Sequence, residues 1–172
     1  ENGVSWFTSY DDFGRMIKKW GPDESEANPL KKIEYGDAVL DNETGEIIEP
    51  GCIISKSKDN SSDEWLSTYT YVDGLGRTIQ VKSEANNGQW RTIDSYYNEA
   101  GKNFKTSVAY FTSTSDYTPG DENQKCTENE YDAMGRVVKT IYTDGTESRT
   151  VYRKNKIITI DANNHASSKE VS

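Results

Sequence analysis

Short runs of alternating or β-branched apolar residues recur along the chain, separated by polar clusters rich in Gly, Pro, Asn and Asp. Runs of this length and composition are typical of β-strands, in which successive side chains point to opposite faces. The runs that predict strands are 6–10, 15–20, 30–35, 38–40, 46–48, 52–55, 65–72, 77–83, 90–97, 103–112, 136–142, 147–152 and 156–160. No stretch requires a long helix, so the pattern predicts an all-β chain of antiparallel hairpins.

Several of the predicted reversals between strands share one local sequence. An aromatic residue is followed by Asp or Asn, two variable residues, Gly and a base, except that Val72 separates Tyr71 from Asp73 in the second copy. The acid or amide can accept a hydrogen bond from the backbone two residues on, and Gly can adopt a positive φ without a steric clash. The residues at these positions are Tyr10, Asp11, Gly14 and Arg15; Asp73, Gly76 and Arg77; Tyr97, Asn98, Gly101 and Lys102; and Tyr131, Asp132, Gly135 and Arg136.

A fifth, degenerate copy of this turn begins at Asp161, where Asn164 and His165 replace the glycine and the base. The turns begin at residues 11, 73, 98, 132 and 161, so their spacings are 62, 25, 34 and 29 residues. A repeat of this kind predicts stacked copies of one small structural unit. The long interval leaves room for a divergent unit or an insertion at 21–68.

The repeated Tyr-Asp-x-x-Gly-Arg turn resembles the YD repeat of bacterial Rhs proteins. Related repeats occur in the shells of insecticidal toxin complexes and in animal teneurins. The resemblance runs from Ser9 to the C-terminus, with a poor match over 21–68. It implies an elongated or curled β-sheet that is an open segment of an Rhs-type shell or stalk. It also implies a non-catalytic scaffold that encloses or presents a toxin or effector domain. Such a scaffold would belong to a bacterial protein that is secreted or lies at the cell surface.

Length and composition agree with a thin sheet. The 172 residues suit one β domain, 1–172, and only 33% of them are hydrophobic, with a mean hydropathy of −0.90. Eleven tyrosines can each bury a ring while the hydroxyl stays hydrated. Because Glu1 is not a natural start, we expect this chain to be a piece of a longer polypeptide. The rest of that polypeptide is then a predicted binding partner. The polar segment 113–129, which contains Pro119 and Gly120, is predicted to be a mobile loop.

Charge and apolar content exclude several partners. The net charge of −9 and the pI near 4.7 oppose nucleic-acid binding, which needs a concentrated positive surface. The doublets Lys18-Lys19 and Lys31-Lys32 are interpreted as isolated and solvated. No apolar run approaches the length of a membrane span.

Cys52 and Cys126 have no metal-binding spacing and could form a disulfide or remain two buried thiols.

Three catalytic or metal-binding interpretations are weaker than their structural alternatives. Arg91, the segment 110–115 and Glu128-Asn129-Glu130 resemble the three elements of ADP-ribosyltransferases, but the last two are too close in sequence. The single histidine, His165, has no nucleophile motif around it. Residues 41–46 fit a calcium loop poorly. No phosphate-binding glycine loop is present, so the sequence predicts no cofactor, no metal and no enzymatic activity.

The turn residues are therefore predicted to be architectural. Each Arg is expected to lie along a neighbouring tyrosine ring and to direct its guanidinium at an Asp of an adjacent unit. The alternative function is a carbohydrate-binding or adhesive surface module. In that case the aromatic rings would stack on sugars of a cell-surface glycan, and the candidates are Trp6, Trp20, Trp65 and Trp90.

Overall fold

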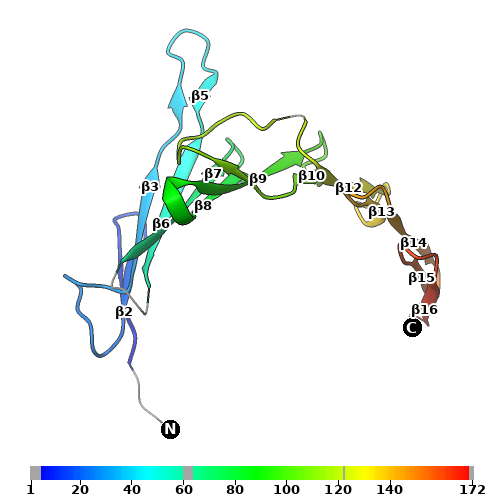
Figure 1. Ribbon diagram of the computed structural model, residues 1–172, viewed down its shortest axis with the longest axis horizontal. Coiled ribbons are helices and arrows are strands. Elements are labelled where there is room, and N and C mark those ends of the chain that lie inside the picture. The colour runs from blue at the N-terminus through cyan, green and yellow to red at the C-terminus, as the bar shows by residue number, and fades with distance from the viewer. Residues whose placement is uncertain (1–4, 60–63, 122, 171–172) are drawn as a thin grey trace. The chain divides into compact units, whose positions relative to one another are not determined.

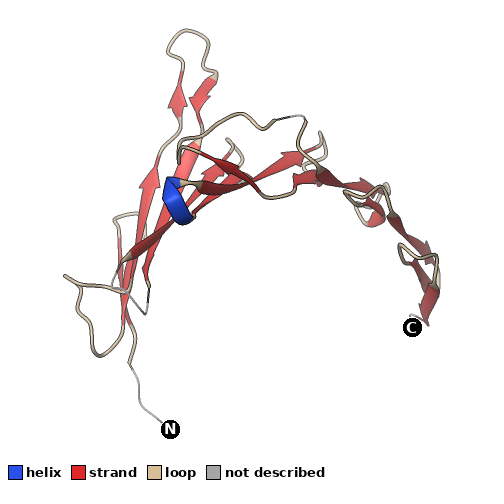
Figure 2. Cartoon of the chain, in the orientation of Figure 1, coloured by secondary structure: helices blue, strands red, loops and turns tan. Residues whose placement is uncertain are grey.

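A computed structural model describes residues 5–59, 64–121 and 123–170. Almost all regular structure in these residues is β (Figures 1 and 2). The first strands are β1 Phe7–Tyr10, β2 Met16–Trp20, β3 Lys31–Gly36, β4 Val39–Leu40, β5 Ile47–Glu49, β6 Gly51–Lys58, β7 Trp65–Val72 and β8 Thr78–Glu84. The later ones are β9 Trp90–Tyr97, β10 Asn103–Ser107, β11 Tyr110–Thr112, β12 Cys126–Tyr131, β13 Val137–Ile141, β14 Glu147–Arg153, β15 Lys156–Ile160 and β16 Ala166–Glu170. The short element η1, Asn86–Gly88, is a single 3₁₀ turn.

The strands follow one antiparallel path in the order β1-β2-β3-β6-β7-β8-β9-β10-β12-β13-β14-β15-β16, and β11 also pairs with β9. Strands β4 and β5 form a separate two-stranded sheet. Within the described residues the path does not close on itself, because β1 and β16 each have one neighbour. The predicted fold class, an open all-β sheet of repeated antiparallel hairpins, is confirmed.

The structure differs from the predicted strands at several places. The run predicted as one strand at 103–112 is divided into β10 and β11. Strand β12 begins at Cys126, inside the segment 113–129 that the sequence predicts to be a loop. The sequence also places the last strand at 156–160, whereas β16 adds Ala166–Glu170 beyond it. Every residue of β16 is exposed, so this strand forms through its backbone pairing with β15 and has no apolar alternation to reveal it. Mobility of the rest of 113–129 stays a prediction.

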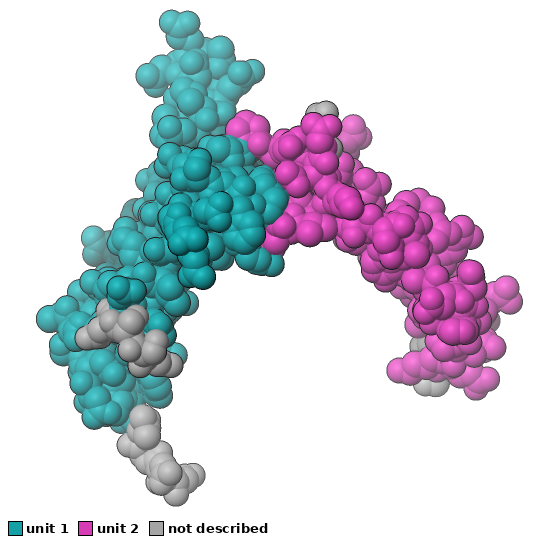
Figure 3. Space-filling model, viewed as in Figure 1, with its two compact units in different colours: residues 1–92, 110–118 teal, residues 93–109, 119–172 magenta. Residues whose placement is uncertain are grey.

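The chain divides into two compact units, residues 1–92 with 110–118 and residues 93–109 with 119–172 (Figure 3). The centre of the first unit is polar. Tyr71, Gln80, Lys82 and Thr92 are all buried on one face of β7, β8 and β9, and the segment 110–118 covers them. Tyr71 is the one large hydrophobic side chain among the described residues that is buried. A thin sheet of this kind gains its order from hydrogen bonds more than from apolar burial.

In the second unit, the strands from β10 to β16 form successive hairpins. The most buried polar groups of this unit are Asp94 and Ser107, and the Asp94 amide donates to Ser107 Oγ at 2.8 Å. Strand β13 is half-buried along its whole length, as expected for a strand with neighbours on both sides.

Candidate functional site

The turn between β12 and β13 is closed by its first residue, Asp132. Its Oδ1 accepts the amides of Met134 and Arg136, both at 2.9 Å, and Arg136 Nε donates to Oδ2 at 2.8 Å. The backbone adds two bonds, from Asp132 N to Arg136 O and from Gly135 N to Asp132 O, both 2.9 Å. Gly135 has φ +76°, the left-handed conformation that such a turn requires.

The other predicted turns have the same geometry. Asp11 and Asp73 each accept the amides two and four residues on and bind the Arg at the fourth position. Asn98 Oδ1 accepts the Lys102 amide at 2.9 Å, so the amide variant keeps the closing bond. The glycines at the left-handed position are Gly14, Gly76, Gly101 and Gly135, with φ between +73° and +76°.

The degenerate copy at Asp161 also forms the side-chain-closed turn. Asp161 Oδ1 accepts the amides of Asn163 and His165 at 2.9 and 2.8 Å, and Asn164 takes φ +63° in place of glycine. Asn tolerates this conformation because its short polar side chain can bond locally. His165 Nδ1 lies 3.3 Å from Asp161 Oδ2, in the position that arginine occupies elsewhere, and the imidazole is exposed.

In the described part of the chain, a tyrosine from the following strand completes at least three of these turns, and we call the combination a turn lock. Tyr35, Tyr131 and Tyr152 each donate their hydroxyl to the carbonyl of the residue just after the basic turn residue. The acceptors are Met16 O at 3.1 Å, Asn103 O, and Val137 O at 3.3 Å. Each turn lock therefore ties a reversal to the next strand of the sheet.

In two turn locks the arginine also stacks on that tyrosine. The Cζ of Arg15 lies 4.2 Å from the Tyr35 ring centroid, and that of Arg136 lies 4.0 Å from the Tyr152 centroid. The tyrosine contact agrees with the prediction, but the predicted Asp partner is wrong. Arg15, Arg77 and Arg136 bind the Asp of their own turn, because the Asx geometry places that carboxylate within reach of the residue four positions on.

Tyr35 and Tyr152 were missed by the sequence analysis. Tyr35 follows Arg15 by 20 residues, Tyr131 follows Lys102 by 29, and Tyr152 follows Arg136 by 16. The spacing varies with the length of the intervening connection, so no fixed motif marks these tyrosines. Strand pairing alone brings each hydroxyl to its carbonyl.

We expect Gly76→Val to destabilise the first unit by roughly 1–2 kcal/mol, because a β-branched residue is strained at φ +75°. No heavy atom lies within 4 Å of a Cβ placed there, so the cost is conformational and not steric. Gly76→Asn is the matched control and should cost less, since Asn164 occupies the same position with φ +63°. Urea unfolding monitored by tryptophan fluorescence measures both, and equal losses would contradict the assignment.

Acid should weaken the β12–β13 turn. Hydrogen bonds from the Arg136 amide and guanidinium hold the pKa of Asp132 below its ordinary value of 3.8. Because the folded pKa is depressed, this contribution is fully present above pH 3.8 and is lost as the pH falls through the folded value. Asp132→Asn should flatten this part of the stability–pH curve, and its unfolding midpoint should change less between pH 5 and pH 2.5. An unchanged slope would contradict the assignment.

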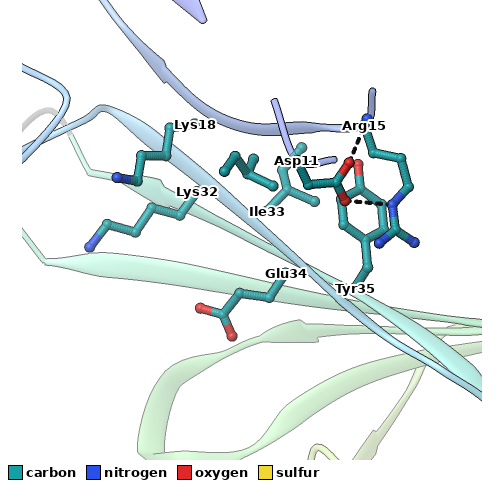
Figure 4. Close-up of a pocket in the computed structure, with 8 residues that line it drawn as sticks. Asp11, Arg15, Lys18, Lys32, Ile33, Glu34 and Tyr35 are labelled. Atoms are coloured by element: carbon teal, nitrogen blue, oxygen red, sulfur yellow. Dashed lines mark hydrogen bonds and ion pairs between the residues drawn. The ribbon is translucent and has the colours of Figure 1, made fainter. Parts of the chain in front are cut away.

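A hollow at one turn lock lies beside Asp11 and Arg15, between β2 and β3 (Figure 4). It is an open groove of about 390 Å³, lined also by Tyr35, Lys18 and Glu34. Figure 4 shows the Arg15 guanidinium held against the Asp11 carboxylate beside the Tyr35 ring. The charged groups at this end of the groove are paired with one another, which fits architecture better than ligand binding.

The four tryptophans proposed as sugar platforms all contact another side chain. Lys19 Nζ lies 5.0 Å from the Trp6 ring and Lys32 Nζ 4.6 Å from the Trp65 ring. Trp20 stacks on Phe7 at 5.9 Å, and Trp90 meets Tyr69 edge to face at 5.1 Å. These contacts engage all four rings, and they give no support to the carbohydrate-binding alternative.

The lysine doublets are not isolated, which corrects the sequence interpretation. Strands β2 and β3 place Lys18 opposite Lys32 and Lys19 opposite Lys31. Their charges are moderated by Glu26, whose Oε1 is 3.9 Å from Lys18 Nζ, and by the tryptophan contacts described above.

The three transferase-like elements have structural partners where they lie. Arg91 is opposite Phe111 in the β9–β11 pair, and Thr112 Oγ1 donates to the Thr114 carbonyl at 3.1 Å. Glu130 lies on β12 with its Oε1 3.2 Å from Lys139 Nζ. Cross-strand pairing accounts for this carboxylate without a substrate.

The remaining candidates also have local explanations. Asp41 Oδ1 accepts the amides of Glu43 and Thr44 at 2.9 and 2.7 Å, so the calcium-like segment is a hydrogen-bonded turn. Cys52 and Cys126 are free thiols, and burial raises the pKa of both. The described residues contain no cluster of three His, Cys, Asp or Glu suited to a metal ion. No helix in the described part has the length and apolarity needed to cross a membrane.

Comparison with known proteins finds similarity in structure only. No protein-family model and no curated protein sequence matches the chain. The crystal structure of TcdB2-TccC3 aligns with a TM-score of 0.71 at 14% identity, over 99% of this chain and 11% of that chain. The same complex without its hypervariable C-terminal region gives 0.70 at 15% identity, over 94% and 13%. A Tc holotoxin pore from Photorhabdus luminescens gives 0.67 at 15% identity, over 94% and 12%.

These values show a shared fold. The chain spans about an eighth of the length of the toxin-complex chains that it matches. Its fold is thus similar to that of a segment within much larger toxin-complex proteins.

Proposed function

We propose that the chain is a non-catalytic wall segment of an Rhs-type YD-repeat protein, in which turn-locked hairpins build a rigid shell or stalk around a toxin or effector domain. The observation that carries the proposal is the recurrence of one turn geometry at Asp11, Asp73, Asn98, Asp132 and Asp161 in a sheet with a toxin-complex fold. Repetition of this kind is expected of a structural protein, since each hairpin can be closed by a copy of the same turn.

The energetics of the sheet also support a structural role. In three turns the arginine is paired with the Asp of its own turn, and the most buried lysine is bonded to backbone carbonyls. Order in such a wall comes largely from hydrogen bonds, so it does not need a thick apolar core. A thin wall with two accessible faces suits a protein that separates an interior from solvent.

The partners that follow are the rest of a longer polypeptide and an enclosed effector domain, in a bacterial protein that is secreted or displayed at the cell surface. Residues 1–172 would form one repeat-built domain, with 21–68 as a divergent unit. The turn residues from Tyr10 to Arg136 would act as structural positions without a catalytic or cofactor-binding role. The carbohydrate-binding alternative is not developed, because each of its four candidate tryptophan rings contacts another side chain.

Electron cryomicroscopy of the full-length polypeptide tests the proposal. We expect β1 and β16 to pair with further strands, and this segment to form part of a wall around a separate domain. A full-length structure in which both edges face solvent and nothing is enclosed would overturn the proposal.

A further inference from the structure

The hairpin formed by residues 37–50, which we call the finger, projects from the ends of β3 and β6 in the first unit (Figure 1). It contains β4 and β5, which form their own two-stranded sheet. Within the described residues these two strands pair only with each other, so both outer edges keep unpaired backbone groups. An isolated two-stranded hairpin is at best marginally stable in water and gains from a third strand.

The finger carries four exposed aliphatic side chains, and the paired residues Leu40 and Ile47 share one face. Val39, Leu40, Ile47 and Ile48 are all exposed, to 47%, 52%, 46% and 59%. Four adjacent large aliphatic residues with this exposure are unusual in a protein whose hydrophobic content is 33%.

The finger is also strictly acidic. Between residues 37 and 50 there are five carboxylates and no Lys, Arg or His. The two nearby turn arginines are each paired with the Asp of their own turn, Arg15 with Asp11 and Arg77 with Asp73. The acidic residues are Asp37, Asp41, Glu43, Glu46 and Glu49.

The finger is held in place at both ends. At its tip, the Asp41 carboxylate accepts two amides, and Gly45 takes φ +71° to close the turn. Next to the tip, Ile47 Cδ1 lies 3.6 Å from where a Cβ on Gly74 would stand, and at the base Pro50 and Gly51 are buried. A pre-formed strand edge loses little conformational entropy when a partner adds to it.

We propose that the finger is a docking site for an extended polypeptide segment with alternating apolar and lysine or arginine side chains. The segment pairs with an outer edge of the finger as a third strand. Its apolar side chains cover Leu40 and Ile47, and its cations meet the five carboxylates. Backbone pairing supplies affinity, and the alternation supplies selectivity. The inference rests on the finger alone and is independent of the proposed shell function.

Fluorescence anisotropy with a labelled heptapeptide of alternating Leu and Lys tests the apolar part. The unmodified chain should bind it saturably and should not bind a Leu/Glu heptapeptide. Leu40→Ser with Ile47→Ser should weaken binding at least about tenfold. The matched control is Leu66→Ser with Val108→Ser, whose side chains are also 52% and 46% exposed, and it should stay within about twofold of wild type.

A second pair of variants separates docking from general attraction to a protein of net charge −9. Both triple variants remove three exposed carboxylates, and only the first should weaken binding by about tenfold. The finger variant is Glu43→Gln, Glu46→Gln and Glu49→Gln, and the control is Asp12→Asn, Asp23→Asn and Glu99→Gln. Equal weakening by both would overturn the proposal. So would sedimentation showing that Leu40 and Ile47 mediate self-association while the peptide does not bind.

Discussion

Replacing Lys82 by Met should lower the free energy of unfolding of the first unit by about 3 kcal/mol, the largest effect expected in this chain. The Lys82 side chain has no solvent exposure. Its ammonium donates to the Asp116 carbonyl at 2.6 Å, to Thr118 Oγ1 at 3.1 Å and to the Thr114 carbonyl at 3.2 Å. Methionine fills similar space but leaves these three acceptors without that donor.

Urea unfolding measures the loss, and hydrogen exchange of the amides in 113–118 locates it. Lys105→Met is the matched control, because Lys105 is partly exposed and lies 3.8 Å from Glu128, so its pair should contribute less than about 1 kcal/mol. If exchange in 113–118 responds equally to both variants, Lys82 does not fasten this segment.

Replacing Asp73 by Ala should cost about 2 kcal/mol, the second largest effect. The carboxylate accepts the amides of Leu75 and Arg77 at 2.9 Å and binds the Arg77 guanidinium at 2.6 Å. Only 20% of the Asp73 side chain is exposed, so water replaces these bonds incompletely. Chemical unfolding of the purified chain provides the measurement.

Asp73→Asn should lose about half as much stability as Asp73→Ala. An amide oxygen can still accept the backbone hydrogen bonds, as that of Asn98 does. Asp12→Ala is the control for an exposed acid beside a turn, and it should leave the unfolding midpoint unchanged. A loss from Asp73→Asn as large as that from Asp73→Ala would assign the stability to the ion pair instead of the turn.

The turns could be predicted from the sequence because their chemistry is local. Asp132, Gly135 and Arg136 interact within five residues, so the motif itself contains the hydrogen bonds and the positive φ. The tyrosines of the turn locks depend on which strands pair and in what register. No local pattern distinguishes Tyr35 or Tyr152 from the chain's other tyrosines.

Burial was less predictable than strand position. In β8 the polar residues Gln80 and Lys82 are buried, while Val81 between them is only half-buried. Alternation predicts that Val81 faces the interior and that Gln80 and Lys82 face solvent, since apolar side chains normally define the interior. The segment 110–118 reverses this expectation because its backbone carbonyls, brought from more than thirty residues away, satisfy the polar side chains.

Amide hydrogen exchange at the turns tests the central claim most directly, namely that side-chain-closed reversals hold the hairpins of this sheet in place. The amides of Arg15, Arg77 and Arg136 should exchange roughly tenfold or more slowly than unstructured amides, and Asp73→Ala should release Arg77 alone. Exchange of all three at unstructured rates in the unmodified chain would contradict the account.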